Sequence, residues 1–170
     1  MFTNVEIEKY FNAEKTESFL FSGIGIVGIV LALLFFFYFK TSFYRGAAIP
    51  LSTIGLLLGV VGYTIYARSD SDRIRNVYAN DMNPGELKEI EIPRMETVIK
   101  NFVMYRYIEI VLAVIGIGLF FYFQKNIVQQ FWSGVGIGLF AMALLALGAD
   151  YFAEKRGRIY LKGLKSLYME

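Results

Sequence analysis

The sequence predicts an all-α membrane protein whose four transmembrane helices form two tandem hairpins. Four apolar segments cover most of the chain, and each is close to the ~20 residues that a helix needs to cross the hydrocarbon core. Hydrophobic residues make up 56% of the sequence, above the ~45–50% of soluble domains. The first segment lies close to the second and the third close to the fourth, which predicts the hairpins. The segments are residues 18–39, 46–67, 103–123 and 129–153.

These segments divide the chain into an N-terminal helix, a first hairpin, a helical linker, a second hairpin and a tail. The boundaries are 1–17, 18–68, 69–102, 103–153 and 154–170.

The N-terminal part is predicted to be a short helix and not a signal peptide. Thr3 and Glu6 have the spacing of a capping box, which predicts a helix over residues 3–15. Acidic residues before Ser18 give the wrong charge for the start of a signal peptide.

The linker is predicted to contain short cytoplasmic helices. Residues 70–79 extend the second membrane helix with one apolar side, and Asn83-Pro84-Gly85 predicts a turn followed by a short helix. Pro93 then begins a helix that runs on into the third membrane segment.

Two further helix signals lie outside the linker. Pro50 is interpreted as marking the start of the second membrane helix. In the tail, Leu161, Leu164 and Leu167 recur at helical spacing. This pattern suits an interfacial helix under the bilayer or a solvated tail that packs on the linker.

Basic residues predict the orientation. Only Lys40, Arg45 and Lys125 lie in the hairpin loops, whereas the other Lys and Arg residues lie in the N-terminal part, the linker and the tail or at their borders. Because cytoplasmic segments carry an excess of Lys and Arg, we expect both termini and the linker to be cytoplasmic.

The composition argues against an enzyme. The chain has no Cys and no His, which removes thiolate nucleophiles, disulfides and His-based metal or acid–base sites. No clustered carboxylate motif predicts a metal site. We therefore expect no catalytic residues, no metal and no cofactor. The net charge of +2 is spread around the apolar segments, so no nucleic-acid partner is predicted.

Glycines indicate where helices pack closely. Gly55, Gly59 and Gly62 lie along one face of the second membrane helix, and small residues let membrane helices approach one another. This face is predicted to pack either inside a four-helix bundle or against another membrane protein or a second copy of the chain.

One charge cluster is predicted at the cytoplasmic mouth of the bundle. Arg106 and Glu109 are three residues apart in the third segment and are expected to pair. Asp150 lies at a similar depth in the fourth segment, and Arg68 ends the second. These four residues form either a structural ion-pair network or a binding or proton-linked site.

The two hairpins also suggest an internal repeat. Residues 36–39 and 120–123 are both Phe-Phe-Tyr-Phe, and both hairpins begin and end on the same side, so the repeat is parallel. The alternative is that any two aromatic-rich membrane hairpins look alike.

Several short runs resemble an uncharacterised family of small four-helix bacterial inner-membrane proteins. The resemblance implies a bacterial cytoplasmic membrane and no assigned activity, and some such short proteins are immunity partners of toxins. The runs are Asp81-Met82-Asn83-Pro84, Pro93-Arg94-Met95-Glu96, Lys100-Asn101-Phe102, Tyr105-Arg106, Glu109 and Phe152-Ala153-Glu154-Lys155-Arg156-Gly157.

Two functions remain open from the sequence. In the first, the protein is non-enzymatic and binds in the bilayer through helix–helix or protein–protein contacts, as an accessory subunit or a toxin-immunity partner. In the second, it is a small dimeric transporter or channel that uses Glu109 and Asp150. The middle of each segment has few polar residues, which favours the first function.

Overall fold

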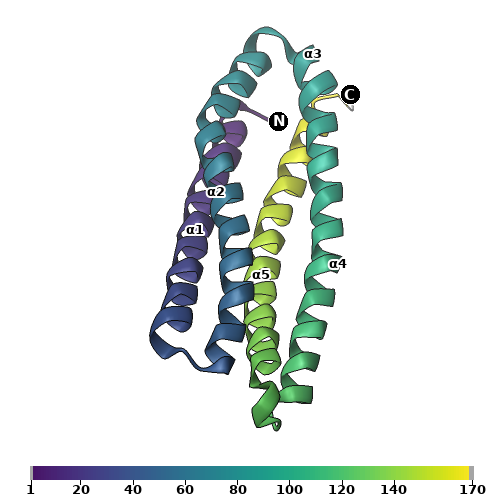
Figure 1. Cartoon of the computed structure of the whole chain (residues 1–170). Coiled ribbons are helices and arrows are strands. Elements are labelled where there is room, and N and C mark those ends of the chain that lie inside the picture. The colour runs from purple at the N-terminus through teal and green to yellow at the C-terminus, as the bar shows by residue number, and fades with distance from the viewer. Residues whose placement is uncertain (1, 169–170) are drawn as a thin grey trace.

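The structure, a computed structural model, describes residues 2–168 and is helical throughout this range apart from short turns (Figure 1). Its four longest helices pair as two antiparallel hairpins, which confirms the predicted arrangement. By length and composition, four helical stretches can cross a membrane. In chain order the elements are α1 (Asn4–Leu34), η1 (Phe35–Phe39), α2 (Ser42–Met82), α3 (Pro84–Glu86), η2 (Leu87–Glu91), α4 (Ile92–Phe123), η3 (Ile127–Gln129) and α5 (Gln130–Ser166).

The helices are longer than a membrane is thick. Helix α2 has 41 residues, about 60 Å at ~1.5 Å per residue, whereas the hydrocarbon core is ~30 Å thick. The extra length gathers at the end that holds both chain ends and α3 (Figure 1). We call this end the head (residues 2–17, 68–102 and 154–168) and the opposite end, with the turns 35–41 and 124–129, the loop end.

The head has its own hydrophobic core. Tyr10 of α1 stacks on Tyr160 of α5 with ring centroids 4.1 Å apart, and Leu164 of α5 is fully buried. The predicted N-terminal helix, linker and tail are therefore not separate pieces. They continue the membrane helices and pack together, and the tail joins this core instead of lying along a bilayer. The buried core residues are Phe2, Ile7, Tyr10, Phe11, Ala79, Leu87, Met95, Tyr160 and Leu164.

Helix starts follow the sequence signals, with one exception. The Glu6 carboxylate accepts a hydrogen bond from the Thr3 backbone N–H at 2.9 Å, and Asn83 ends α2 with a non-helical backbone. Pro50, however, lies inside α2 and does not start it. The helix begins at Ser42 because Thr41 caps it, with its hydroxyl oxygen accepting from the Tyr44 N–H at 3.4 Å.

Glycines hold the first hairpin together, and of the three that the sequence indicated, Gly55 and Gly62 make this contact whereas the side-chain position of Gly59 does not. A Cβ atom added to Gly62 would lie 2.7 Å from the Ser18 carbonyl oxygen, and one on Gly55 2.9 Å from the Gly25 carbonyl oxygen. A Cβ on Gly59 would meet nothing within 4 Å. The Gly59 backbone is instead approached by Gly25, whose added Cβ would lie 2.6 Å from the Gly59 nitrogen. The critical partner of α2 is therefore Gly25, and Gly59 tolerates a side chain.

A second set of glycines joins the two hairpins near the loop end. A Cβ on Gly138 of α5 would lie 2.7 Å from the Pro50 ring and 2.8 Å from the Ala47 carbonyl oxygen of α2. Gly46 and Gly134 are tighter still, because a Cβ on either would overlap the backbone of the opposite helix. We call this contact of α2 with α5 the glycine crossing.

Candidate functional site

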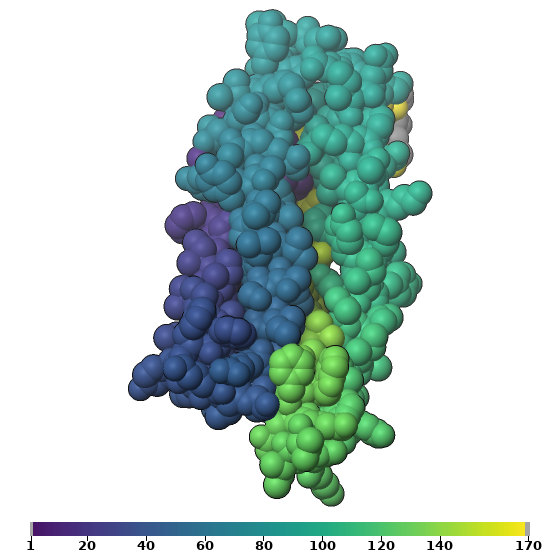
Figure 2. Space-filling view, in the orientation of Figure 1, coloured from purple at the N-terminus to yellow at the C-terminus, as the bar shows by residue number. Residues whose placement is uncertain are grey.

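The two hairpins diverge between the glycine crossing and the head. Helix α2 packs on α1 and α5, whereas α4 packs mainly on α5 and scarcely touches α2. A cavity of about 640 Å³ lies between them, with walls from all four long helices. Figure 2 shows its mouth as a furrow between α2 and α4, with α5 behind it. We call it the inter-hairpin cavity.

Small side chains on α5 create the space. Ala143, Ala146, Ala149 and Ala153 line the cavity at helical spacing. Such residues normally let helices close on one another. Here α2 and α4 stand apart along this stretch, so the alanines leave an opening instead.

The cavity is polar toward the head and apolar toward the glycine crossing. Its apolar part is lined by Leu57, Leu58 and Val61 of α2 together with Leu112 of α4. A molecule in this cavity would therefore meet charged groups at one end and hydrocarbon at the other.

Two of the predicted site residues meet in the cavity wall. Glu109 of α4 and Asp150 of α5 both line the cavity, and their carboxyl groups lie near each other. One carboxylate oxygen of Glu109, Oε2, is buried and has no hydrogen-bond partner among the described residues.

The predicted pairing of Arg106 with Glu109 is wrong. Among the described residues, Arg106 forms its ion pair with Glu154 of α5. Glu154 is buried and also binds Arg158, with 2.7 Å from Nε to the carboxylate. A single carboxylate thus ties α4 to α5 at the head border, and Arg106 does not line the cavity.

Arg68 lies on the opposite wall from the acid pair. It lines the cavity from α2, and its only ion pair among the described residues is a long one, 3.8 Å to Asp72 of its own helix. Half of its side chain is exposed. Of the four predicted charges, three therefore share the cavity, and none of these three pairs with Arg106.

Two further arginines line the head end of the cavity, and sequence reasoning did not identify them as site residues. Arg94 of α4 binds Glu91 through Nε at 2.8 Å and Nη2 at 2.6 Å. Arg156 of α5 pairs with Glu17 of α1, and its Nε is buried without a hydrogen-bond partner among the described residues. Both residues occur in runs that carried the family resemblance, but nothing in their spacing brings two distant helices together.

Glu14 of α1 completes the polar end. Its carboxylate accepts from the Tyr10 hydroxyl at 3.3 Å and lies 3.2 Å from the Ser69 hydroxyl. Burial raises the pKa of Glu14 above its ordinary value, and nearby arginines only partly offset this. Tyr10, Glu14 and Ser18 follow one another at intervals of four, a signal that could have revealed a polar helix face.

Three acidic residues thus line the cavity, but they do not form a metal site. Within residues 2–168 no group of three or more acidic side chains is arranged to hold a metal ion.

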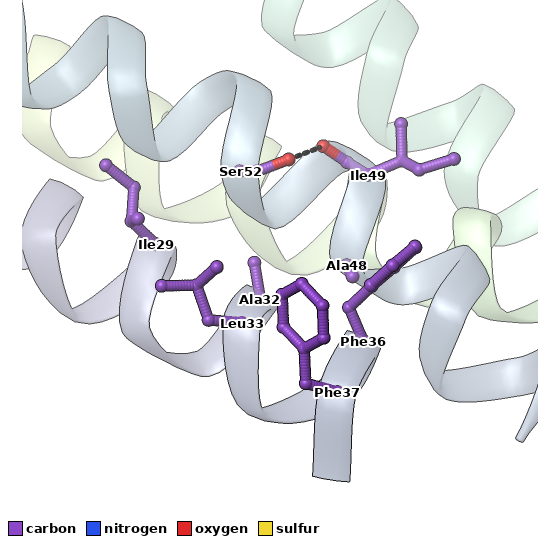
Figure 3. A pocket seen from close by; sticks show the side chains of 8 residues that line it. All are labelled: Ile29, Ala32, Leu33, Phe36, Phe37, Ala48, Ile49 and Ser52. Atoms are coloured by element: carbon purple, nitrogen blue, oxygen red, sulfur yellow. Dashed lines mark hydrogen bonds between the residues drawn. The ribbon is translucent and has the colours of Figure 1, made fainter. Parts of the chain in front are cut away.

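A second hollow, near the loop end of the first hairpin, carries no chemistry. It is an apolar depression of about 250 Å³ between α1 and α2, lined by aliphatic and phenylalanine side chains (Figure 3). Its hydroxyl group, that of Ser52, donates to the Ile49 carbonyl of the same helix at 2.9 Å.

Comparisons with family models, curated protein sequences and solved structures found no match. The family resemblance therefore stays a prediction. The inter-hairpin cavity, built from all four long helices, is the feature of this molecule best suited to hold a ligand.

Proposed function

We propose that this protein acts by binding, without catalysis, and that the inter-hairpin cavity holds a ligand taken from the membrane. One observation carries the proposal: the hairpins are joined at the glycine crossing and in the head, and they stand apart between these two contacts. An empty cavity of this size in a bilayer would be unfavourable, because its walls would lack packing partners. Its volume falls in the ~300–1,000 Å³ range of ligand sites.

The orientation belongs to the same proposal. The head carries most of the basic residues, which supports a cytoplasmic head in a bacterial inner membrane, with both termini inside. The furrow between α2 and α4 would then open sideways into the inner half of the bilayer. A membrane molecule could enter through it without crossing water.

A small transporter is the second candidate, and the Glu109–Asp150 pair favours it. Two facing carboxyl groups and a buried oxygen without a partner suit a proton-linked or cation site. Against this, the glycine crossing closes the path toward the loop end with backbone-to-backbone contacts. Proton or cation flux in liposomes containing the pure protein would favour this candidate.

The proposal can be tested by filling the cavity. Ala146→Trp places a large side chain in the cavity wall, whereas Ala141→Trp makes the same change at an exposed position of α5. Each variant is purified in mild detergent, and bound lipids, small molecules and proteins are identified by mass spectrometry. We expect a stoichiometric ligand in the wild type and in Ala141→Trp, and its loss in Ala146→Trp.

The same purification separates cavity binding from binding on an outer face. A partner protein or second copy that stays bound to Ala146→Trp would place the binding site outside the cavity and contradict the proposal. A wild type that retains no ligand or partner under several mild detergents would also contradict it.

A further inference from the structure

The head end of the inter-hairpin cavity gathers three arginines from three helices, beside the carboxyl group of Glu14 of α1. Arg68 comes from α2, Arg94 from α4 and Arg156 from α5, and all three line the cavity. A guanidinium group has five N–H donors. The contacts to Asp72, Glu91 and Glu17 use only some of them.

The Arg156 guanidinium keeps donor capacity beyond its contact with Glu17. The Arg156 side chain is 16% exposed, and its buried Nε has no hydrogen-bond partner within the described residues. Buried polar groups are nearly always hydrogen-bonded in folded proteins. Arg156 lines the cavity, so a small rotation of its guanidinium group would present this nitrogen to an acceptor there.

The apolar end of the same cavity indicates that the rest of the ligand is hydrophobic. Leu57, Leu58, Val61 and Leu112 offer a hydrocarbon surface next to the acid pair. A transmembrane helix of a partner does not fit. A helix ~10 Å across occupies roughly 80 Å³ per Å of length, so about 640 Å³ would hold little more than one turn. A flexible chain with a compact head fits better.

We infer that the inter-hairpin cavity binds an anionic amphiphile of the lipid type, with its phosphate or carboxylate at Arg68, Arg94 and Arg156 and its acyl chain between α2, α4 and α5. This inference rests on the proposed function and names the ligand class. Arginine suits phosphate and carboxylate because its planar fork binds two oxygens at once. Glu109 and Asp150, between the arginines and the apolar end, face the neck of the ligand and can exchange hydrogen bonds with a hydroxyl or amine there.

The test uses single-chain lipids and the full chain in a neutral detergent. Thermal unfolding is followed as lysophosphatidylglycerol is added, because a ligand that binds only the folded state raises the midpoint. Lysophosphatidylcholine of equal chain length supplies the chain without the net negative charge. Inorganic phosphate supplies the anion without a chain. We expect the anionic lysolipid to stabilise the protein at concentrations at least about tenfold lower than either control.

A pair of variants isolates the arginine contribution. Arg68→Gln removes a charge that lines the cavity, and Arg75→Gln removes one that does not. The two arginines are matched, because both are half-exposed on α2 and both pair with Asp72. We expect about tenfold weaker binding of the anionic lysolipid by Arg68→Gln, the size of one lost charge-assisted contact, and little change in Arg75→Gln. Arg156→Gln is a less suitable test, because it also leaves the partly buried Glu17 without its partner.

Failure of this inference is distinguishable from failure of the proposed function. If the zwitterionic lysolipid stabilises as well as the anionic one, and Ala146→Trp abolishes both effects, the cavity binds amphiphiles but not anions in particular. If inorganic phosphate stabilises the protein as well as the anionic lysolipid does, the acyl chain contributes nothing. The inference of an amphiphile would then be wrong, and the cavity would be a site for a free anion. If Ala146→Trp binds the anionic lysolipid as tightly as the wild type, the cavity is not the site, and the inference and the proposed function both fail.

Discussion

The two contacts that join the hairpins are built on different physical principles. At the glycine crossing, Gly46, Gly134 and Gly138 bring α2 and α5 together with almost no side chain between them. In the head, large side chains such as Tyr160 and Leu164 fill a core. Helices in lipid gain nothing from hiding apolar surface and associate by close packing. In water, apolar burial drives the contact.

Charge follows the same division. The nine ion pairs among the described residues lie in the head or at its border. The glycine crossing has none. One chain thus uses two kinds of helix contact, and the inter-hairpin cavity lies between them, where neither is present.

Shortening a head core residue should have the largest effect. Leu164 is fully buried, so Leu164→Ala should lower the free energy of unfolding by ~2–5 kcal/mol through lost burial and a new cavity. Leu145→Ala makes the same change at a half-exposed position on α5 within its membrane segment and should cost far less. Both are measured by denaturation with SDS in mixed micelles. Equal losses would mean that the head is not a hydrophobic core.

Adding one carbon at the glycine crossing should come next. Gly134→Ala places a Cβ against the Phe43 backbone and should cost ~1–3 kcal/mol by overpacking. Gly148→Ala on the same helix meets nothing within 4 Å and should be neutral or stabilise by up to ~1 kcal/mol, because alanine favours the helix. The denaturation midpoints of the two variants are compared with that of the wild type in the same assay. If Gly134→Ala is as stable as the wild type, the two helices can move apart at the glycine crossing without loss of stability.

The partner of Arg106 can be identified by a double-mutant cycle. Arg106→Gln combined with Glu154→Gln should show a coupling energy on the order of 0.5–1 kcal/mol, modest because Arg106 is 38% exposed. When Arg106→Gln is combined with Glu109→Gln, the two changes in the free energy of unfolding should add to within about 0.5 kcal/mol. Strong coupling to Glu109 instead would restore the pairing that the sequence indicated.

The smallest effect should be a pH dependence at Glu14. Because burial raises its pKa in the folded state, the folded chain holds this proton at pH values where the unfolded chain has lost it. Glu14 therefore lowers the stability of the protein more and more as the pH rises above the pKa that this group has in the unfolded chain. The effect stops growing once the group also ionises in the folded chain. At pH values below the pKa of the unfolded chain, Glu14 is protonated in both states and this loss of stability is absent.

Glu14→Gln should remove this penalty. Its stability relative to the wild type should rise as the pH increases above about 4, the ordinary pKa of a glutamate, as measured by denaturation at each pH. Glu8→Gln changes an exposed residue on the same helix and should run parallel to the wild type. A Glu14→Gln curve parallel to the wild type would show that Tyr10, Ser69 and the nearby Arg68, Arg94 and Arg156 fully compensate the buried carboxylate.

Much of the fold could be read from local patterns. Apolar length gave the four membrane segments, and Asn83-Pro84 gave the turn between hairpins. Pro50 misled, because a proline inside a helix and one at its start carry the same local signal, and the Thr41 cap decides between them. Gly59 misled for a related reason. Spacing tells which glycines share a helix face but not which neighbour, if any, approaches each of them.

Composition and local spacing suffice to predict that this chain is helical, that four segments suit a membrane, and that its residues offer no thiol or imidazole group. These properties follow from composition and from periodicity along one helix. Only the tertiary structure decided that Arg106 pairs with Glu154, that Arg94 and Arg156 join Arg68, and that a cavity separates the hairpins. Each of these depends on how far apart two helices stand, and that distance is set by the glycine crossing at one end and the head core at the other.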